Sequence, residues 1–349
     1  MSIIGGLDVH RAQITFDWVD RDSGEARRGR ITPATRAGLR AWLGELPSTG
    51  GGFAVEGCTG WRFMVEELQA AGLAAHLAEP AETSSLRGPK RRAKTDRADA
   101  RLLRELLEQG RLPCSWIPPT WILELRTTVR LRKTLVDQRT AWQQRIHAAL
   151  FHQGLPRPTQ ELLSEATRGW LERVALPAAS RQLLGVALGQ IDHLDAVLDP
   201  IDQWLRTLAR RQPGCRALIA THYGIGAITA PTILAELGDA RRFGGGDQMV
   251  RATGLDITVY SSDGKRSPGH LSRQGPEVLR WALFEAAKAA ARPSSPDYPY
   301  YQQVKVRQGG NRATLAVARK LARRVRHTLV ALGEGALAPV DGLPLPEAA

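Results

Sequence analysis

Cysteine is scarce in this 349-residue sequence, and acidic residues are outnumbered by basic ones. The three cysteines, Cys58, Cys114 and Cys215, lie far apart and form no CxxC pair. The sequence therefore indicates neither a zinc knuckle nor a disulfide framework, and it favours a reducing compartment, the cytoplasm. No basic segment followed by an apolar one opens the chain, so we expect no secretory signal peptide.

A long, purely apolar run is also missing. The nearest candidate, residues 217–235, has no charged side chain but contains glycine, proline, histidine and threonine. Polar and helix-breaking residues of this kind disfavour a membrane span, so the stretch predicts a pair of buried helices. We therefore expect no membrane partner.

The balance of charge is the feature that departs most from an average protein. The 48 lysines and arginines exceed the 35 aspartates and glutamates, which leaves a formal net charge of +13. A surplus of this size favours polyanionic partners, with nucleic acid the first candidate and an anionic membrane surface the second. Apolar residues make up 43% of the chain, as in ordinary globular proteins, and the length predicts roughly two domains.

The first hundred residues alternate between strand and helix patterns. We expect strands over 3–8, 13–19, 26–31, 53–56 and 74–78, and helices that open at Pro33, cover 60–71 and run from Thr95 or Asp96 to Gln109. Three successive strands followed by helix and strand units are compatible with a ribonuclease H-like mixed sheet, although other α/β layouts share this order.

The remainder of the chain is helical in pattern. A proline-rich linker over 110–119 precedes two long helices, 121–150 and 180–208, which predict an antiparallel, coiled-coil-like arm that either packs within the chain or dimerises. We therefore expect an α/β domain over 1–110, the linker and helical arm over 111–212, an α-rich domain over 213–333 and a flexible tail over 334–349.

Four carboxylates lie at positions that suit metal binding. Asp8 and Glu56 end the apolar strands IIGGLDVH and FAVEGCTG, and Asp96 and Asp99 are spaced i, i+3 in KTDRADA, on one helical face. Together they can hold Mg²⁺ through hard oxygen ligands, as two-metal phosphoryl-transfer sites do. Two alternatives stay open: the strand ends can be plain turns, and nearby arginines can neutralise the helical pair.

Basic residues lie close to these carboxylates and again in the C-terminal half. Phosphate contacts are expected from the run Lys90, Arg91, Arg92, Lys94 and Arg97. The segment HYGIGAITAPTILAELGD reads as helix, hairpin and helix and resembles a helix-hairpin-helix motif, in which Gly224 and Gly226 would leave backbone N–H groups open to a phosphate. Core packing is the alternative role for these glycines.

A pair of serines, Ser261 and Ser262, sits in a polar turn before Asp263. Cations beside a serine would stabilise its alkoxide and a bound phosphodiester, so a nucleophilic serine is chemically reasonable, while a plain turn is the alternative. The cations of this region are Lys265, Arg266, Arg273 and Arg280. A last tract, 305–326, has no acid of its own and presents either a phosphate-contact surface or a solvated face through Arg319, Lys320 and Arg323.

In this order, the segments resemble the DEDD transposases of the insertion sequence 110 family, which are bridge-RNA-guided recombinases. The resemblance spans residues 3–332 and rests on GLDVH, VEGCTG and KTDRADA in the first part of the chain. In the second part it rests on YGIGAITAPTILAELGD, RRF, GL and YSSDGKRSPGHLSRQGPEVLR.

The resemblance implies a RuvC-type, ribonuclease H-like domain whose acidic tetrad, Asp8, Glu56, Asp96 and Asp99, binds Mg²⁺. It also implies a C-terminal transposase domain with a catalytic serine. Family members commonly have this serine directly before a glycine, which points to Ser262. Ser261 is the second choice, because Asp263 replaces the usual glycine.

By the same resemblance, the serine attacks a DNA phosphodiester and forms a covalent phosphoserine link, and the tetrad of another subunit completes the site. Donor and target DNA are then joined through a junction intermediate, guided by a structured bridge RNA encoded beside the gene. The resemblance further implies a homo-oligomer, from dimer to tetramer, at the bacterial nucleoid. The competing hypotheses are a metal-dependent endonuclease of the Holliday-junction resolvase type and a non-catalytic nucleic-acid-binding scaffold.

Overall fold

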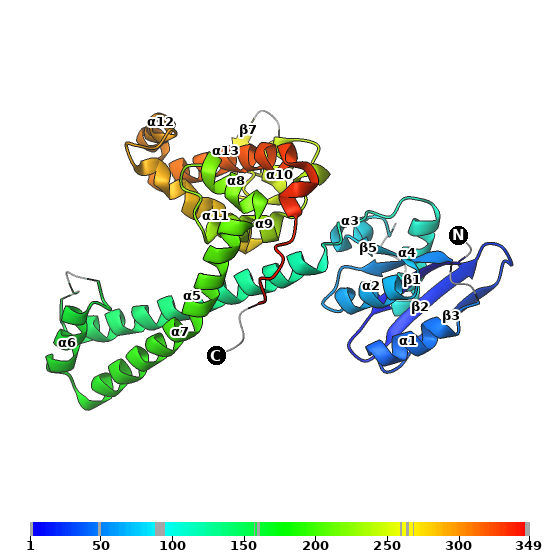
Figure 1. Ribbon diagram of the computed structural model, residues 1–349, viewed down its shortest axis with the longest axis horizontal. Coiled ribbons are helices and arrows are strands. Elements are labelled where there is room, and N and C mark those ends of the chain that lie inside the picture. Colours follow the sequence, from blue (N-terminus) through cyan, green and yellow to red (C-terminus); the bar gives the residue numbers. More distant parts are fainter. Residues whose placement is uncertain are drawn as a thin grey trace. The chain divides into compact units, whose positions relative to one another are not determined.

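The chain divides into two units, residues 1–117 and residues 118–349 (Figure 1). The computed structural model describes residues 3–47, 50–87, 95–156, 158, 161–258, 260–262, 265–267 and 269–345, and for 260–262 and 265–267 it describes the backbone alone.

The N-terminal unit is built on a five-stranded mixed sheet. Its strands are β1 (Ile3–Val9), β2 (Ile14–Asp20), β3 (Ala26–Ile31), β4 (Gly51–Glu56) and β5 (Ala74–Ala78), in the order β3-β2-β1-β4-β5. The first three strands pair antiparallel, whereas β1 with β4 and β4 with β5 pair parallel. The predicted mixed α/β class is therefore confirmed, and β1 is the central strand.

Helices cover both faces of this sheet. They are α1 (Arg36–Gly44), α2 (Trp61–Ala70), α3 (Pro80–Ser85) and α4 (Asp96–Glu108). Because side chains alternate along a strand, Ile3 and Leu7 pack with α1 and α2 in one core cluster, while Ala54 of β4 packs with Leu103 of α4 on the other face.

Two helix starts show the role of capping. The Thr95 hydroxyl accepts a hydrogen bond from the Ala98 N–H, so α4 begins at Asp96 as the sequence predicts. The prediction that Pro33 opens a helix is wrong. The first helix begins at Arg36, because Thr35 is in extended backbone and its hydroxyl caps the N–H of Gly38.

Gly6 lets α4 approach β1 more closely than any other residue would allow. A Cβ at this position would lie 2.1 Å from the carbonyl oxygen of Ala100 and 2.7 Å from the backbone N of Arg104, both in α4. Gly6 is thus a position where a strand glycine permits a close backbone approach. The contact sets the distance between the strand that carries Asp8 and the helix that carries Asp96 and Asp99.

We expect Gly6→Ala to lower the free energy of unfolding by roughly 1–3 kcal/mol, because the added methyl overpacks the β1–α4 contact and pushes the helix away. Urea denaturation of the full chain measures this. Gly44→Ala is the matched control, since a Cβ at Gly44 meets no atom within 4 Å. Equal stability of the two variants would contradict the tight contact.

The C-terminal unit begins with a helical arm, α5 (Thr120–His152) and α7 (Ala178–Arg211). These helices pack antiparallel within the chain: residues 146–150 of α5 join residues 184–191 of α7 in one apolar cluster, and residues 125–129 join residues 201–208 in another. Ion pairs cross between them at Arg132–Asp202 and Arg139–Asp195. A short helix that the sequence did not predict, α6 (Glu165–Arg173), lies between them along the chain.

The rest of this unit is an α-rich body around one large apolar core. Its elements are α8 (Pro213–Thr221), α9 (Thr229–Leu237), η1 (Ala240–Arg242), α10 (Gly246–Ala252), β6 (Tyr260–Ser262), β7 (Lys265–Ser267), α11 (Glu277–Lys288), η2 (Ala289–Ala291), α12 (Tyr298–Gln308), α13 (Gly310–Ala331) and η3 (Gly333–Leu337). The uncharged stretch forms α8 and α9, the expected helix pair. Among the described residues, no helix combines the length and apolar character that crossing a membrane requires.

The segments expected to be a linker and a flexible tail both form hydrogen bonds with other parts of the chain. Ser115 in the linker donates its N–H to the carbonyl of Leu77, beside a bridge between Ala78 and Cys114 at the edge of β5. In the tail, the carbonyl of Pro344 accepts a hydrogen bond from the indole N–H of Trp204 at 2.7 Å.

Candidate metal centre and nucleic-acid interface

The four candidate carboxylates lie on the α4 side of the N-terminal sheet. Asp8 is the sixth residue of β1, and Glu56 is the last residue of the parallel neighbour β4. Asp96 and Asp99 lie in the first turn of α4, which packs against both strands. The parallel pairing of β1 with β4 and the close approach of α4 therefore bring residues from three sequence segments to one place.

Asp8 is the buried centre of this group, with 4% of its surface exposed. Burial raises the pKa of Asp8 from 3.8 to about 6; His10 acts in the opposite direction, and the charges of Asp99, Asp96 and Glu56 raise the pKa further. All three other carboxylates thus lie close enough to repel Asp8. The structure brings the tetrad together and leaves its negative charge only partly compensated.

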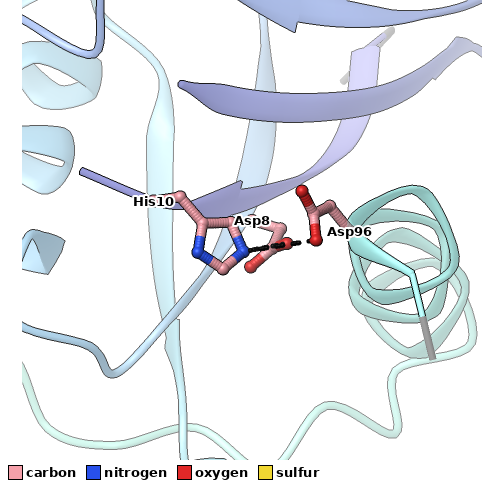
Figure 2. A group of neighbouring side chains, drawn as sticks. All are labelled: Asp8, His10 and Asp96. Atoms are coloured by element: carbon pink, nitrogen blue, oxygen red, sulfur yellow. Dashed lines mark hydrogen bonds and ion pairs between the residues drawn. The ribbon is translucent and has the colours of Figure 1, made fainter. Parts of the chain in front are cut away.

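His10 joins the tetrad from the strand end (Figure 2). Its Nε2 lies 3.1 Å from Oδ2 of Asp8 and 3.4 Å from Oδ1 of Asp96. Gln13 donates from Nε2 to the other oxygen of Asp96 at 3.1 Å. Neither residue was identified from the sequence. The signal for His10 is the D-x-H spacing at the end of a strand, because alternate residues face the same side of a sheet.

An arginine neutralises one carboxylate, as one of the sequence alternatives allowed. Arg87 donates from Nη1 to Oδ1 of Asp99 at 2.5 Å. The Nε of Arg87 is buried and has no hydrogen-bond partner among the described residues. Arg87 therefore compensates the charge of Asp99, whereas no arginine within the described ranges forms an ion pair with Asp8.

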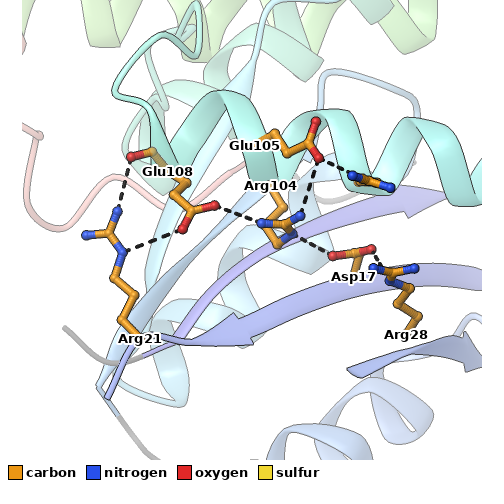
Figure 3. A network of polar contacts seen from close by, with 7 residues as sticks. Asp17, Arg21, Arg28, Arg104, Glu105 and Glu108 are labelled. Carbon is orange, nitrogen blue, oxygen red and sulfur yellow. Dashed lines mark hydrogen bonds and ion pairs between the residues drawn. The ribbon is translucent and has the colours of Figure 1, made fainter. Parts of the chain in front are cut away.

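A nearby buried carboxylate shows what a purely structural acid looks like (Figure 3). Asp17 of β2 accepts from Nε of Arg104 at 2.6 Å and lies 2.9 Å from Nε of Arg28. Two guanidinium groups compensate its charge. Asp8, with three carboxylates and one imidazole around it, has no such compensation, and this difference marks it as a candidate ligand for a cation.

The donor set fits a divalent metal. One ligand atom from each of Asp8, His10 and Asp96 lies within 4.8 Å of the other two. Carboxylate oxygens are the ligands that hard divalent cations prefer. A bound cation would also relieve the repulsion that raises the pKa of Asp8. The cluster is therefore compatible with a divalent metal centre.

The basic residues expected around this centre are only partly visible. Arg97 lies in the first turn of α4 and is exposed. The other four members of that run, Lys90, Arg91, Arg92 and Lys94, lie outside the described residues.

The two glycines of the C-terminal hairpin differ in role. Gly224 has φ +91°, and a Cβ there would lie 2.2 Å from the carbonyl oxygen of Ala286 in α11, so packing explains this glycine. The N–H of Gly226 donates to the hydroxyl of Thr229 at 2.8 Å. The expectation of an open N–H at Gly226 is therefore not met, because the first residue of α9 already satisfies it.

The serine pair lies on a two-stranded hairpin. Ser262 is the last residue of β6 and stands opposite Lys265 of β7, and Ser261 stands opposite Arg266. Asp263 and Gly264, between the strands, lie outside the described residues.

Two further arginines lie near the root of this hairpin. Arg280 donates to the carbonyl oxygens of Gly275 and Arg273, so its guanidinium braces the loop before α11. Arg273 is exposed and has φ 55°, a left-handed conformation that non-glycine residues rarely adopt. Both arginines line a cavity of about 430 Å³ together with Trp281 and Phe284.

The cations of α13 are paired with groups outside their own tract. Arg319 donates to the carbonyl of Leu255, Lys320 lies 3.3 Å from Asp297, and Arg323 lies 2.8 Å from Asp247. The tract has no acid in sequence, but the fold brings acids to it. These contacts reduce the positive charge that the helix presents.

Comparisons with known proteins agree on one class. Residues 5–152 match a transposase model of the DEDD type of IS110, and residues 216–302 match the model of the transposase IS116/IS110/IS902 family. The chain is 27% identical to a probable family 20 transposase of Pseudomonas aeruginosa, over 82% of this chain and 83% of that protein.

Two further relatives are transposases of insertion sequences. The chain is 24% identical to the transposase for insertion sequence element IS1111A of Coxiella burnetii, over 65% of this chain and 64% of the relative. It is 26% identical to the transposase for insertion sequence element IS1328 of Yersinia enterocolitica, over 67% and 69% of the two chains. The two matched ranges include all four carboxylates and both serines.

Proposed function

We propose that this chain, a transposase of the IS116/IS110/IS902 family, cuts and rejoins donor and target DNA. In this proposal a Mg²⁺-binding acidic tetrad and a serine nucleophile carry out the reaction, and a bridge RNA guides it. The observation that carries the proposal is the convergence of Glu56, Asp96 and Asp99 on the buried Asp8. Such a group is costly to keep unless a cation compensates it.

In this proposal residues 1–110 form a RuvC-like domain, in which Asp8, Glu56, Asp96 and Asp99 would hold Mg²⁺. When bound, the metal would supply Lewis-acid stabilisation of the charge on a scissile phosphate. The fold of the chain positions these ligands. Burial in β1 fixes Asp8, and the contact with α4 positions the helical pair.

We assign the nucleophile to Ser262 in the transposase domain, residues 213–333. Its Oγ attacks the phosphorus of a DNA phosphodiester, an Oγ–P bond forms, and the bond from phosphorus to the deoxyribose oxygen breaks. The serine proton passes to a base and the released oxygen takes up a proton, so the step is balanced. The free hydroxyl of another strand then attacks the phosphoserine and restores the serine. The strand register, which pairs Ser262 with Lys265, supports this assignment.

Guidance by RNA and assembly of subunits complete the proposal. The net charge of +13 suits a protein that contacts several phosphate backbones. Sequence reading delegated to base pairing leaves the protein to contact backbone and shape. We propose a homo-oligomer, from dimer to tetramer, that acts at the bacterial nucleoid. The arm over 111–212 contributes to its self-association, and the tetrad of one subunit completes the serine site of another.

The test is an incubation of the full chain with Mg²⁺, DNA carrying the element's end, target DNA and RNA transcribed from the element's flanks, followed by a denaturing gel. We expect covalent protein–DNA bands and joined donor–target strands only when Mg²⁺ and the RNA are both present. RNA of the same composition in scrambled order is the control. Cleaved DNA without any covalent band would instead indicate the resolvase-type nuclease. Covalent bands formed with the scrambled RNA would contradict guidance by the RNA sequence.

A further inference from the structure

His10 lies on the solvent-exposed side of the acidic cluster. It follows β1 by one residue, so its side chain shares a face of the strand with Asp8, as Figure 2 shows. The side chain of His10 is 53% exposed, whereas that of Asp8 is 5% exposed. The imidazole therefore stands between solvent and the buried carboxylate.

The position of Nε2 is the key observation. This atom lies 3.1 Å from an oxygen of Asp8 on the strand and 3.4 Å from an oxygen of Asp96 on the helix. The second oxygen of Asp96 already accepts from Gln13. One donor atom from each of three residues thus faces a common point, and one of the three donors is nitrogen.

We infer that His10 is a metal ligand and that this transposase centre has mixed nitrogen and oxygen donors, which favour Mn²⁺ over Mg²⁺. The inference rests on the metal site proposed above, but not on the serine or the RNA. Imidazole suits first-row transition metals, whereas Mg²⁺ prefers oxygen donors and releases its water reluctantly. The nitrogen of His10 would therefore add affinity for Mn²⁺ and little for Mg²⁺.

A second role for His10 makes the opposite prediction. If the imidazole only compensates Asp8 and Asp96 as a cation, it competes with a metal for the same oxygens. Its removal would then strengthen metal binding. The two roles differ in the sign of one measurable effect.

The experiment uses the full chain freed of metal with a chelator. Thermal unfolding is followed while Mg²⁺ or Mn²⁺ is titrated into the wild type, His10→Ala and His10→Gln. We expect the wild type to bind Mn²⁺ at least about tenfold more tightly than Mg²⁺. We expect both variants to lose about tenfold to a hundredfold in Mn²⁺ affinity, the range that groups supporting a metal typically contribute, with little change for Mg²⁺. His76→Ala, on β5, controls for loss of an imidazole elsewhere in the same sheet.

A spectroscopic readout does not depend on folding stability. Pulsed electron paramagnetic resonance of bound Mn²⁺ should show coupling to a histidine nitrogen in the wild type, and the coupling should be absent from His10→Ala. Mn²⁺ bound without nitrogen coupling, or a gain in Mn²⁺ affinity in His10→Ala, would overturn the inference and leave the tetrad intact. No stabilisation of the wild type by either metal would overturn both this inference and the proposed metal site.

Discussion

DNA cleavage by the Asp8→Asn variant is expected to fall by about a thousandfold, while the metal-free variant becomes more stable than the wild type. The first effect follows if Asp8 is the central ligand, because a metal contributes several kcal/mol of charge stabilisation and each 1.36 kcal/mol is tenfold in rate. The second follows because the asparagine removes a buried charge that three other carboxylates repel.

The stability gain depends on pH in a defined direction. Because the pKa of Asp8 is raised from 3.8 to about 6, the folded protein holds this proton more tightly than the unfolded chain. Stability of the wild type therefore falls, relative to Asp8→Asn, as pH rises from 3.8 to about 6, and the full penalty applies above that. We expect a difference on the order of 2 kcal/mol at neutral pH, and none below the lower value.

Asp17→Asn is the matched control, because Asp17 is also a buried carboxylate of this sheet. It should destabilise the protein, since Arg104, only 12% exposed, loses one of its carboxylate partners and keeps Glu108. Urea denaturation with and without Mg²⁺ measures both variants, and added Mg²⁺ should stabilise the wild type but not Asp8→Asn. A stable Asp8→Asn variant that still cuts DNA, or that still responds to Mg²⁺, would remove Asp8 from the site.

Ser262→Ala should abolish the covalent protein–DNA band, because alanine offers no oxygen to form a bond to phosphorus. Ser261→Ala should keep the band, since our assignment places the attacking oxygen at position 262 and the change leaves that hydroxyl in place. The measurement is the denaturing gel of the RNA-guided reaction, with the labelled DNA shifted by the mass of the protein.

The two serine variants also control for each other, because each removes one hydroxyl oxygen from the same strand. Loss of the band only in Ser261→Ala would move the nucleophile by one position. If both variants retain full cleavage and the wild type forms no adduct, the serines are structural and the chain cuts DNA through activated water. Wild-type-like thermal unfolding of both variants shows that the comparison is not affected by misfolding.

The sequence predicts the local parts of the N-terminal unit well, because short-range physics determines them. A threonine before an apolar helical pattern caps α4, and the alternation of apolar residues places the strands within a few residues of their bounds. The start of α1 differs from the prediction for the same kind of reason: Thr35, not Pro33, supplies the cap.

The tertiary contacts were much less predictable. Nothing near Arg319, Lys320 and Arg323 in sequence shows that the fold brings acids and a carbonyl to them. Arg87 illustrates the intermediate case, since neutralising arginines were expected as an alternative but no pattern selects the one that contacts Asp99.

The candidate centre depends on both kinds of information. The carboxylates themselves are easy to identify in the sequence. Their convergence, however, requires the parallel pairing of β1 with β4 and the close packing of α4 against Gly6. The family resemblance predicts the same four residues. His10 needed only the two-residue period of a strand, and that signal was present in GLDVH.

The ion pairs of the arm restrict how its length can change. From Arg132 to Arg139 on α5, and from Asp202 back to Asp195 on α7, each helix advances seven residues. Removing one such block from both helices would shorten the arm by about 10 Å and keep the remaining pairs opposite each other. A deletion in one helix alone would slide the two out of register. Insertions and deletions in related transposases should therefore occur as matched seven-residue steps in α5 and α7.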